Sequence, residues 1–119
     1  MKIFIIDKDV NTSFSLRVQL SSRGLKVETL GEDDNSISLI HKLDDAQPDF
    51  VVLDLKGFKT DIVDKILNVE SINLSNIIIY SRNTLNADDL GIGIALNKNE
   101  FDVDELAEKI AKIAANKDK

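Results

Sequence analysis

The stretch FVVLDL occupies residues 50–55. Its first four residues are apolar and rich in valine, a pattern typical of a strand that is buried on both faces. Asp54 follows at once, although water would solvate its charge better than the edge of a core does. In open parallel sheets, functional groups collect where strands end in this way. The stretch therefore predicts a central strand with Asp54 as a candidate for chemistry.

The composition is that of one globular domain, which we expect to span residues 1–119. The chain has a mass of 13.2 kDa, with 43% hydrophobic and 30% charged residues. A net charge of -6 argues against nucleic acid or anionic lipid as the main partner. The sequence contains no cysteine, which excludes disulfides, thiol catalysis and thiolate metal sites.

The apolar run near the start of the chain, residues 3–6, is too short for a signal peptide or a membrane span. We therefore expect a cytoplasmic protein that does not contact a membrane.

Apolar runs and helical patterns alternate along the chain. Continuous Val, Ile and Leu strands need cover on both faces, so the alternation predicts an α/β fold, a doubly wound sheet of five parallel strands with five helices. Asp102 is expected to cap the last helix. The predicted strands are residues 3–6, 26–30, 50–53, 76–80 and 94–96; the predicted helices lie around Phe14, Leu16, Val18 and Leu20, over 36–43, 61–69 and, weakly, 87–90, and from Val103 onward.

Polar residues follow four of the predicted strands. Because the carboxyl ends of parallel strands share one edge of the sheet, we expect these side chains to meet there. Each one alone is commonly a turn residue or a helix cap, whereas the whole set is a candidate site. The set consists of Asp7, Lys8 and Asp9 after the first strand, Asp54 after the third, Ser81 after the fourth, and Asn97 and Lys98 after the fifth.

This set resembles the receiver domain of bacterial two-component response regulators. The start, MKIFIIDKD, is similar to the family's KILVVDDD, and PDFVVLDL is similar to its PDLVLLDL. The segment IIIYS places Ser81 at the family's strand-four hydroxyl, and NKNEFDVDEL places Lys98 at its late lysine. The resemblance covers essentially the whole chain. It implies the flavodoxin-like, receiver-type form of the fold.

The resemblance implies that Asp54, exposed at the strand end, accepts a phosphoryl group from a histidine kinase or phosphotransfer protein. Mg²⁺ bound through Asp7, Asp9 and Asp54 would offset the charge, and Ser81 and Lys98 would contact the phosphoryl oxygens. The contact from Ser81 would pull its loop inward and so shift the balance between two conformations of that loop. The module would then signal to a downstream protein through the face formed by helix four, strand five and helix five, without being an enzyme.

Several positions depart from the family pattern. Lys8 replaces the second acid, so we expect Mg²⁺ to bind weakly or not at all. In one interpretation Lys8 turns into solvent and Asp9 takes over as ligand; in the other, its ammonium neutralises Asp7 and Asp54. A pseudo-receiver that binds proteins without phosphorylation is therefore a second interpretation. The further departures are Lys56, Phe58, Arg82, Ala95 and Asn99.

A haloacid-dehalogenase-like phosphatase is a remote third interpretation. The segment FIIDKDVN fits its opening motif, with Asp7 as nucleophile and Asp9 as acid/base. The segment IIIYS, with Ser81, fits its second motif, and Lys98 could be its lysine. However, the last acidic motif of that family should follow the lysine, whereas Asp54 precedes even Ser81. The chain is also too short for the usual cap domain.

A histidine and a pair of glycines are the remaining candidates for a site. His41 has no second ligand at helical spacing, and Gly91 and Gly93 lack the spacing of a nucleotide-binding loop, so neither is expected to form a site. The given sequence ends soon after the last predicted helix, so we expect its output to come from a partner protein, unless an effector domain lies outside this sequence. A homodimer is left open.

Overall fold

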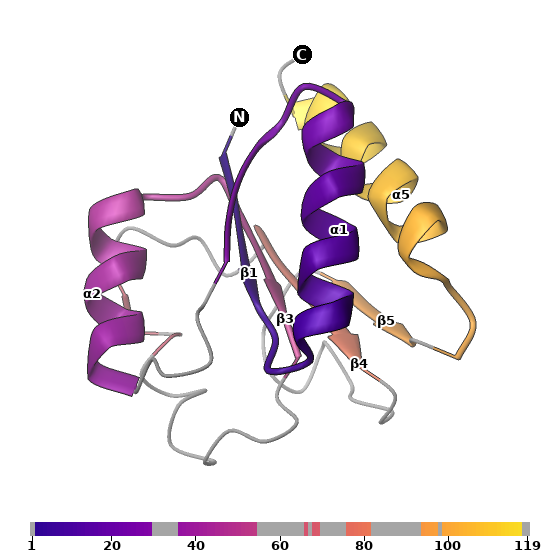
Figure 1. Ribbon diagram of the computed structural model, residues 1–119. Helices are drawn as coiled ribbons and strands as arrows, with labels where there is room; N and C mark the ends of the chain where they lie inside the picture. Colours follow the sequence, from indigo (N-terminus) through magenta and orange to yellow (C-terminus); the bar gives the residue numbers. More distant parts are fainter. Residues whose placement is uncertain are drawn as a thin grey trace.

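The computed structural model describes residues 2–29, 36–54, 66, 68, 69, 76–81, 94–97 and 99–117. Five parallel strands form one sheet in the order β2-β1-β3-β4-β5 (Figure 1). The predicted doubly wound parallel sheet is confirmed. The predicted helix at 87–90, and most of the one at 61–69, lie outside the described residues. The strands are β1 (Lys2–Ile6), β2 (Lys26–Thr29), β3 (Phe50–Leu53), β4 (Ile77–Ser81) and β5 (Ile94–Asn97); the described helices are α1 (Val10–Ser22), α2 (Ser36–Ala46) and α5 (Val103–Lys117).

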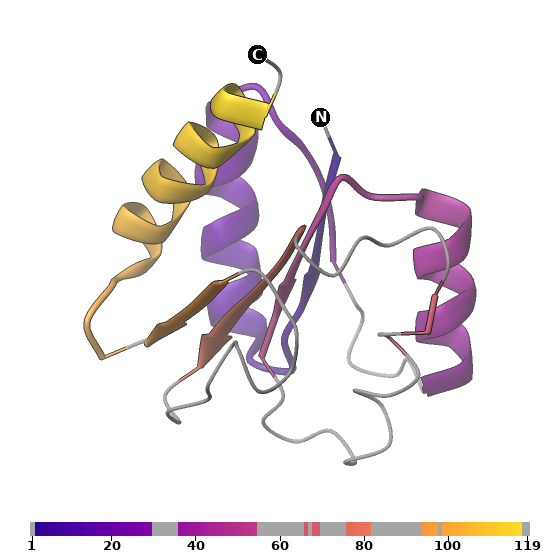
Figure 2. The ribbon, with the colours of Figure 1, turned by 180° about the vertical axis from the view of Figure 1, so that it is seen from behind.

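Described helices lie on both faces of the sheet. Helices α1 and α5 lie side by side on one face, and α2 lies on the other (Figures 1 and 2). Strand β1 pairs with β2 on one side and with β3 on the other, so the strand order reverses between β1 and β3. The carboxyl ends of these two strands therefore form the topological switch point, where ligands bind in folds of this kind.

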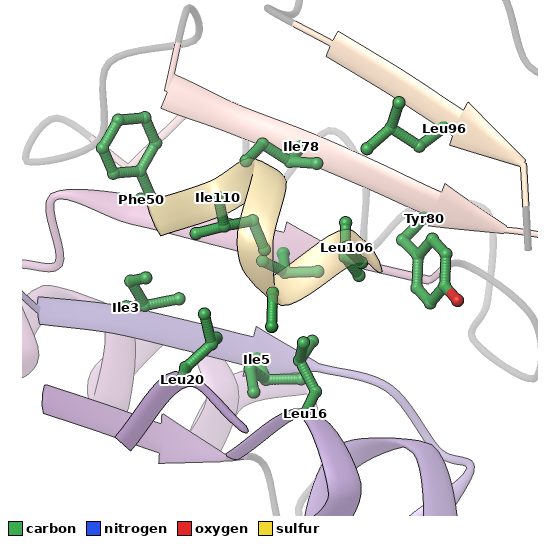
Figure 3. Close-up of a cluster of buried hydrophobic side chains, with 12 residues drawn as sticks. Ile3, Ile5, Leu16, Leu20, Phe50, Ile78, Tyr80, Leu96, Leu106 and Ile110 are labelled. Atoms are coloured by element: carbon green, nitrogen blue, oxygen red, sulfur yellow. The ribbon is translucent and has the colours of Figure 1, made fainter. Parts of the chain in front are cut away.

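The core on the α1 and α5 side is a cluster of aliphatic side chains with two aromatic rings, those of Phe50 and Tyr80 (Figure 3). Val52 and Ile78 belong to this cluster, while Leu53 and Ile79 are buried at adjacent strand positions. None of these four residues is more than 2% exposed, as expected for central strands. The full cluster is Ile3, Ile5, Leu16, Leu20, Phe50, Val52, Ile78, Tyr80, Leu96, Leu106, Ala107 and Ile110.

Helix α1 buries only part of its apolar pattern. Leu16 and Leu20 are buried against the sheet, whereas Phe14 is 65% exposed and Val18 is 50% exposed. Residues two apart are separated by about 200° around a helix, so the pair at 14 and 18 faces away from the pair at 16 and 20. The sequence pattern predicted the helix correctly but did not show that Phe14 and Val18 face away from the core.

Helix α1 ends in a Schellman motif. The N–H of Gly24 donates to the carbonyl of Ser21 at 3.0 Å, and the N–H of Leu25 donates to that of Leu20 at 3.3 Å. Gly24 has a φ of 85°, in the left-handed region where a residue without Cβ is favoured. This turn leads the chain into β2, where Val27 packs against the core.

Helix α5 begins with a capping box. The N–H of Glu105 donates to Oδ1 of Asp102 at 2.8 Å, and the N–H of Asp102 donates to Oε1 of Glu105 at 3.4 Å. Asp102 is thus confirmed as the N-cap. None of the described helices is long and apolar enough to cross a membrane.

Candidate functional site

Two buried carboxyl groups follow neighbouring strands at the switch point. Ile6 and Leu53 are paired residues at the ends of β1 and β3. Asp7 directly follows β1, and Asp54 directly follows β3. The N–H of Asp54 donates to the carbonyl of Ile6 at 2.9 Å, so the hydrogen-bond ladder continues past the end of β3. Asp7 is 8% exposed and Asp54 is 4% exposed. The structure therefore brings together the two acids that the sequence placed at this edge.

The burial of Asp54 differs from the expectation that it is exposed. Its residue position is still part of the ladder between two paired strands, and a central strand is covered on both sides. Removing a carboxylate from water costs several kcal/mol unless hydrogen bonds or positive charge offset the loss. Asp54 stays a candidate for function because it lies at the switch point of the sheet.

Asp9 has a structural task in addition to its predicted one. Its Oδ1 accepts hydrogen bonds from the N–H groups of Asn11 and Thr12 at 3.1 and 3.3 Å, and its Oδ2 accepts one from the Thr12 hydroxyl at 2.9 Å. These are the bonds of a helix N-cap. The N–H of Asp9 also donates to Oδ1 of Asp7 at 2.8 Å. Asp9 thus ties the start of α1 to the carboxylate of Asp7.

Ser13 supports the same loop, a role that was not predicted from the sequence. It is 6% exposed, and its hydroxyl donates to the carbonyl of Asp7 at 3.1 Å. Its position three residues before Leu16 and seven before Leu20 places it on the buried face of α1. A serine at an apolar helical spacing was the signal that could have revealed it.

Lys8 is exposed at the surface between the two acids of the loop. Within the parts of the chain that the structure describes, no three histidine or acidic side chains are grouped so as to hold a metal ion. In the predicted set of Asp7, Asp9 and Asp54, the carboxylate of Asp9 accepts the three hydrogen bonds at the start of α1. Metal binding at these residues stays a prediction.

The hydroxyl and lysine of the predicted site are described only in part. Ser81 pairs with Asn97 across β4 and β5, which places its backbone at the same sheet edge, but its side chain lies outside the description. Lys98 lies outside the described residues, as do Lys56, Phe58 and Arg82. Ala95 lies in β5 opposite Ile79.

The comparisons with known proteins identify the fold. A two-component response regulator from Clostridium difficile superposes with a TM-score of 0.76 at 21% identity, over 100% of this chain and 99% of that one. The chemotaxis response regulator CheY4 of Vibrio cholerae gives a TM-score of 0.76 at 17% identity, with 94% and 97% of the chains covered. The chain has the receiver fold. No family model matches the sequence, and no curated protein matches it either.

A response regulator from Desulfuromonas acetoxidans has the same receiver fold, with a TM-score of 0.75 at 14% identity over 96% of each chain. These comparisons show the fold that the chain shares with solved receivers. In this receiver fold, Asp54 directly follows the central strand β3, and Asp7 directly follows its neighbour β1. The sequence identities are low, so the residues at the sheet edge, and not overall similarity, must support a function.

Proposed function

We propose that the chain is a two-component receiver module that accepts a phosphoryl group on Asp54 and signals through protein–protein contact. The observation that carries the proposal is the pair of buried carboxyl groups, Asp7 and Asp54, at the switch point of a receiver fold. Apolar residues at these positions would cost less free energy to bury. Two acids lie where ligands bind in folds of this kind, which supports a functional role for them.

The proposed reaction is a phosphoryl transfer from a phosphohistidine. A carboxylate oxygen of Asp54 forms a bond to phosphorus while the phosphorus–nitrogen bond breaks. The bonding electron pair stays on the imidazole nitrogen, which takes up a proton. Ser81 and Lys98 are proposed to contact the phosphoryl oxygens, since a hydroxyl and an ammonium both donate to them.

Mg²⁺ fits this site in part. The carboxylate oxygens of Asp7 and Asp54 are ligands of the kind that Mg²⁺ prefers, and bound Mg²⁺ would neutralise charge on the phosphoryl oxygens. Asp9 would join these ligands only by giving up hydrogen bonds at the N-terminus of α1. We therefore propose weak metal binding through Asp7 and Asp54, with Asp9 as the third ligand at a cost to the helix cap.

A pseudo-receiver is the second candidate, and the loop after β1 favours it. Lys8 puts a cation where the receiver pattern has an acid, and Asp9 caps α1. Both features reduce the acidic groups that are available for a metal. In this alternative the fold and its surfaces are retained for protein binding, and Asp54 is not phosphorylated.

The exposed face of α1 is proposed as the docking surface for the phosphodonor. Val10, Phe14 and Val18 are 47%, 65% and 50% exposed and lie four residues apart, so they form one apolar stripe. Arg17 is the single charge in the sequence of α1. Val10 is three residues from Asp7, so the stripe begins beside the acids. Exposed apolar stripes of this kind mark protein-binding sites.

The proposed output follows the family pattern. A downstream protein is proposed to bind the face that includes β5 and α5, where exposed charged residues alternate with the buried ones of α5. The proposal requires no catalytic turnover by this chain.

Incubation with Mg²⁺ and phosphoramidate, followed by intact-mass analysis, tests the function. We expect a gain of one phosphoryl group that disappears in Asp54→Asn and persists in Asp44→Asn, a matched change of an exposed aspartate on α2. Labelling that persists in Asp54→Asn would refute the acceptor. An unmodified chain that never gains mass, while still binding a partner, would support the pseudo-receiver.

A further inference from the structure

Tyr80 links the end of β4 to the segment after β5. Its hydroxyl donates a 2.6 Å hydrogen bond to the carbonyl of Phe101. Tyr80 itself is 4% exposed, and its ring lies in the core cluster beside Leu106, with the oxygen pointing away from the aliphatic side chains (Figure 3). A buried tyrosine hydroxyl needs such a partner, because burying it without a hydrogen bond would destabilise the fold.

The segment that receives this bond is a compact turn. The carbonyl of Asn97 accepts hydrogen bonds from the N–H groups of Glu100 and Phe101 at 3.0 and 3.1 Å. The side-chain oxygen of Asn97 accepts another from the N–H of Asn99 at 2.7 Å. Tyr80 pairs with Leu96 across β4 and β5, so it stands next to the point where the turn begins. We call residues 97 and 99–101 the β5–α5 turn.

The far end of this turn is also fixed. Phe101 packs against the core cluster, and Nζ of Lys109 lies 5.0 Å from the centroid of its ring. The capping box of α5 starts at the next residue, Asp102. The carbonyl of Phe101 is therefore the junction between the turn and α5, and the Tyr80 hydroxyl holds it from β4.

We propose that Tyr80 is a positioning residue for the β5–α5 turn, and through it for Lys98. In sequence, Lys98 directly follows Asn97, and Ser81, the proposed hydroxyl of the site, directly follows Tyr80. The Tyr80 side chain thus joins β4, which ends at Ser81, to the turn that begins at Asn97, the residue before Lys98 in the sequence. The part concerning Lys98 rests on the proposed function, whereas the anchoring of the turn does not.

Amide hydrogen exchange of Tyr80→Phe tests the anchoring. This change removes one oxygen and keeps the ring in the core. We expect the amides of Glu100 and Phe101 to exchange about tenfold faster than in the unmodified chain. Ile5→Val, a conservative change in the same cluster, should leave these two amides unchanged relative to global stability. Equal exchange at the turn in both variants would overturn the proposal.

The rate of Asp54 labelling by phosphoramidate tests the link to Lys98. We expect Tyr80→Phe and Lys98→Ala each to slow labelling, and the double variant to be no slower than Lys98→Ala alone, because both changes act on the same group. Ile5→Val should not slow it. Independent, multiplicative losses would refute positioning through Lys98. If the unmodified chain takes no label, the proposed function fails, and the exchange experiment still decides whether Tyr80 anchors the turn.

Discussion

The backbone N–H of Asp9 lies 2.8 Å from Oδ1 of Asp7, so the residue that caps α1 also holds the carboxylate at the end of β1. The loop between strand and helix is thereby closed by hydrogen bonds within the chain. Ser13 adds a bond from the helix back to the carbonyl of Asp7. This loop has a defined shape that its own residues stabilise.

The cap predicts the response of stability to changes at Asp9. Asp9→Ala removes the acceptors of three hydrogen bonds and should lower the free energy of unfolding by about 1 kcal/mol. Asp9→Asn keeps an acceptor at the N-cap and should lose only a fraction of that. Urea denaturation followed by circular dichroism measures both variants. Asp44→Ala, at an exposed position on α2, is the control and should not destabilise the chain. Equal losses in Asp9→Asn and Asp9→Ala would show that the charge, and not the cap, is what matters.

Burial predicts that truncations in the central strands destabilise the fold far more than a truncation on the exposed face of α1. Val52→Ala and Ile78→Ala each create a cavity in the core and should cost about 2–5 kcal/mol of unfolding free energy. Leu53→Ala and Ile79→Ala should behave alike. Val18→Ala removes methyl groups from a half-exposed position and should change stability by less than about 0.5 kcal/mol. Losses below about 1 kcal/mol at all four strand positions would mean that the central strands are misplaced.

The apolar stripe on α1 predicts a separation between two kinds of phosphodonor. Phe14→Ser should leave labelling by phosphoramidate unchanged, because a small donor needs no docking surface. The same change should slow transfer from a phosphorylated histidine kinase about tenfold or more, since exposed aromatic residues commonly carry much of the binding free energy. Phosphotransfer is measured with a panel of kinases, using those that label the unmodified chain.

Ser15→Ala, an exposed change on α1 outside the stripe, is the control for that experiment. Equal rates of kinase transfer in Phe14→Ser and in the unmodified chain would remove α1 as the docking surface. Slower labelling by phosphoramidate would instead mean that Phe14 affects the site itself.

The sheet could be predicted from the sequence because its signals are local and repeated. Strands β1, β3 and β4 are short runs rich in β-branched and other apolar residues, whereas β2 has the sequence KVET and a weaker signal. The acids that follow β1 and β3 lie next to one another once the parallel order is known. The burial of Asp54 could not be predicted, since it depends on pairing between strands far apart in sequence. The same holds for the bond from Tyr80 to Phe101, which joins residues 21 positions apart.

The role of Asp9 shows a different limit of the sequence. Aspartate after a strand is both a common metal ligand and a common helix N-cap, and the sequence Asp-Val-Asn-Thr fits both. The helix cap is visible only when the Thr12 hydroxyl and the first amides of α1 are placed around the carboxylate. The residue type therefore left both uses open, and the local geometry shows the helix cap.

The change Lys8→Asp decides between the two proposed functions. At a separation of about 4 Å and an intermediate effective dielectric, two unit charges interact by about 4 kcal/mol. Solvent reduces this value for an exposed side chain such as Lys8, so we expect Lys8→Asp to raise the affinity for Mg²⁺ or Mn²⁺ by about tenfold to a hundredfold. The same change should restore or speed phosphorylation of Asp54. Calorimetric titration with Mn²⁺ measures the affinity, and intact-mass analysis measures the phosphorylation.

Lys8→Ala separates the loss of the cation from the gain of an acid. If repulsion by the ammonium is what weakens metal binding, Lys8→Ala should recover part of the affinity, and Lys8→Asp should recover more because it adds a ligand oxygen. If only the missing ligand matters, Lys8→Ala should bind metal as weakly as the unmodified chain does. Should the unmodified chain already bind Mn²⁺ as tightly as Lys8→Asp, the lysine does not act on the site. The pseudo-receiver would then lose its main support, because Asp7 and Asp54 would suffice as metal ligands beside an exposed lysine.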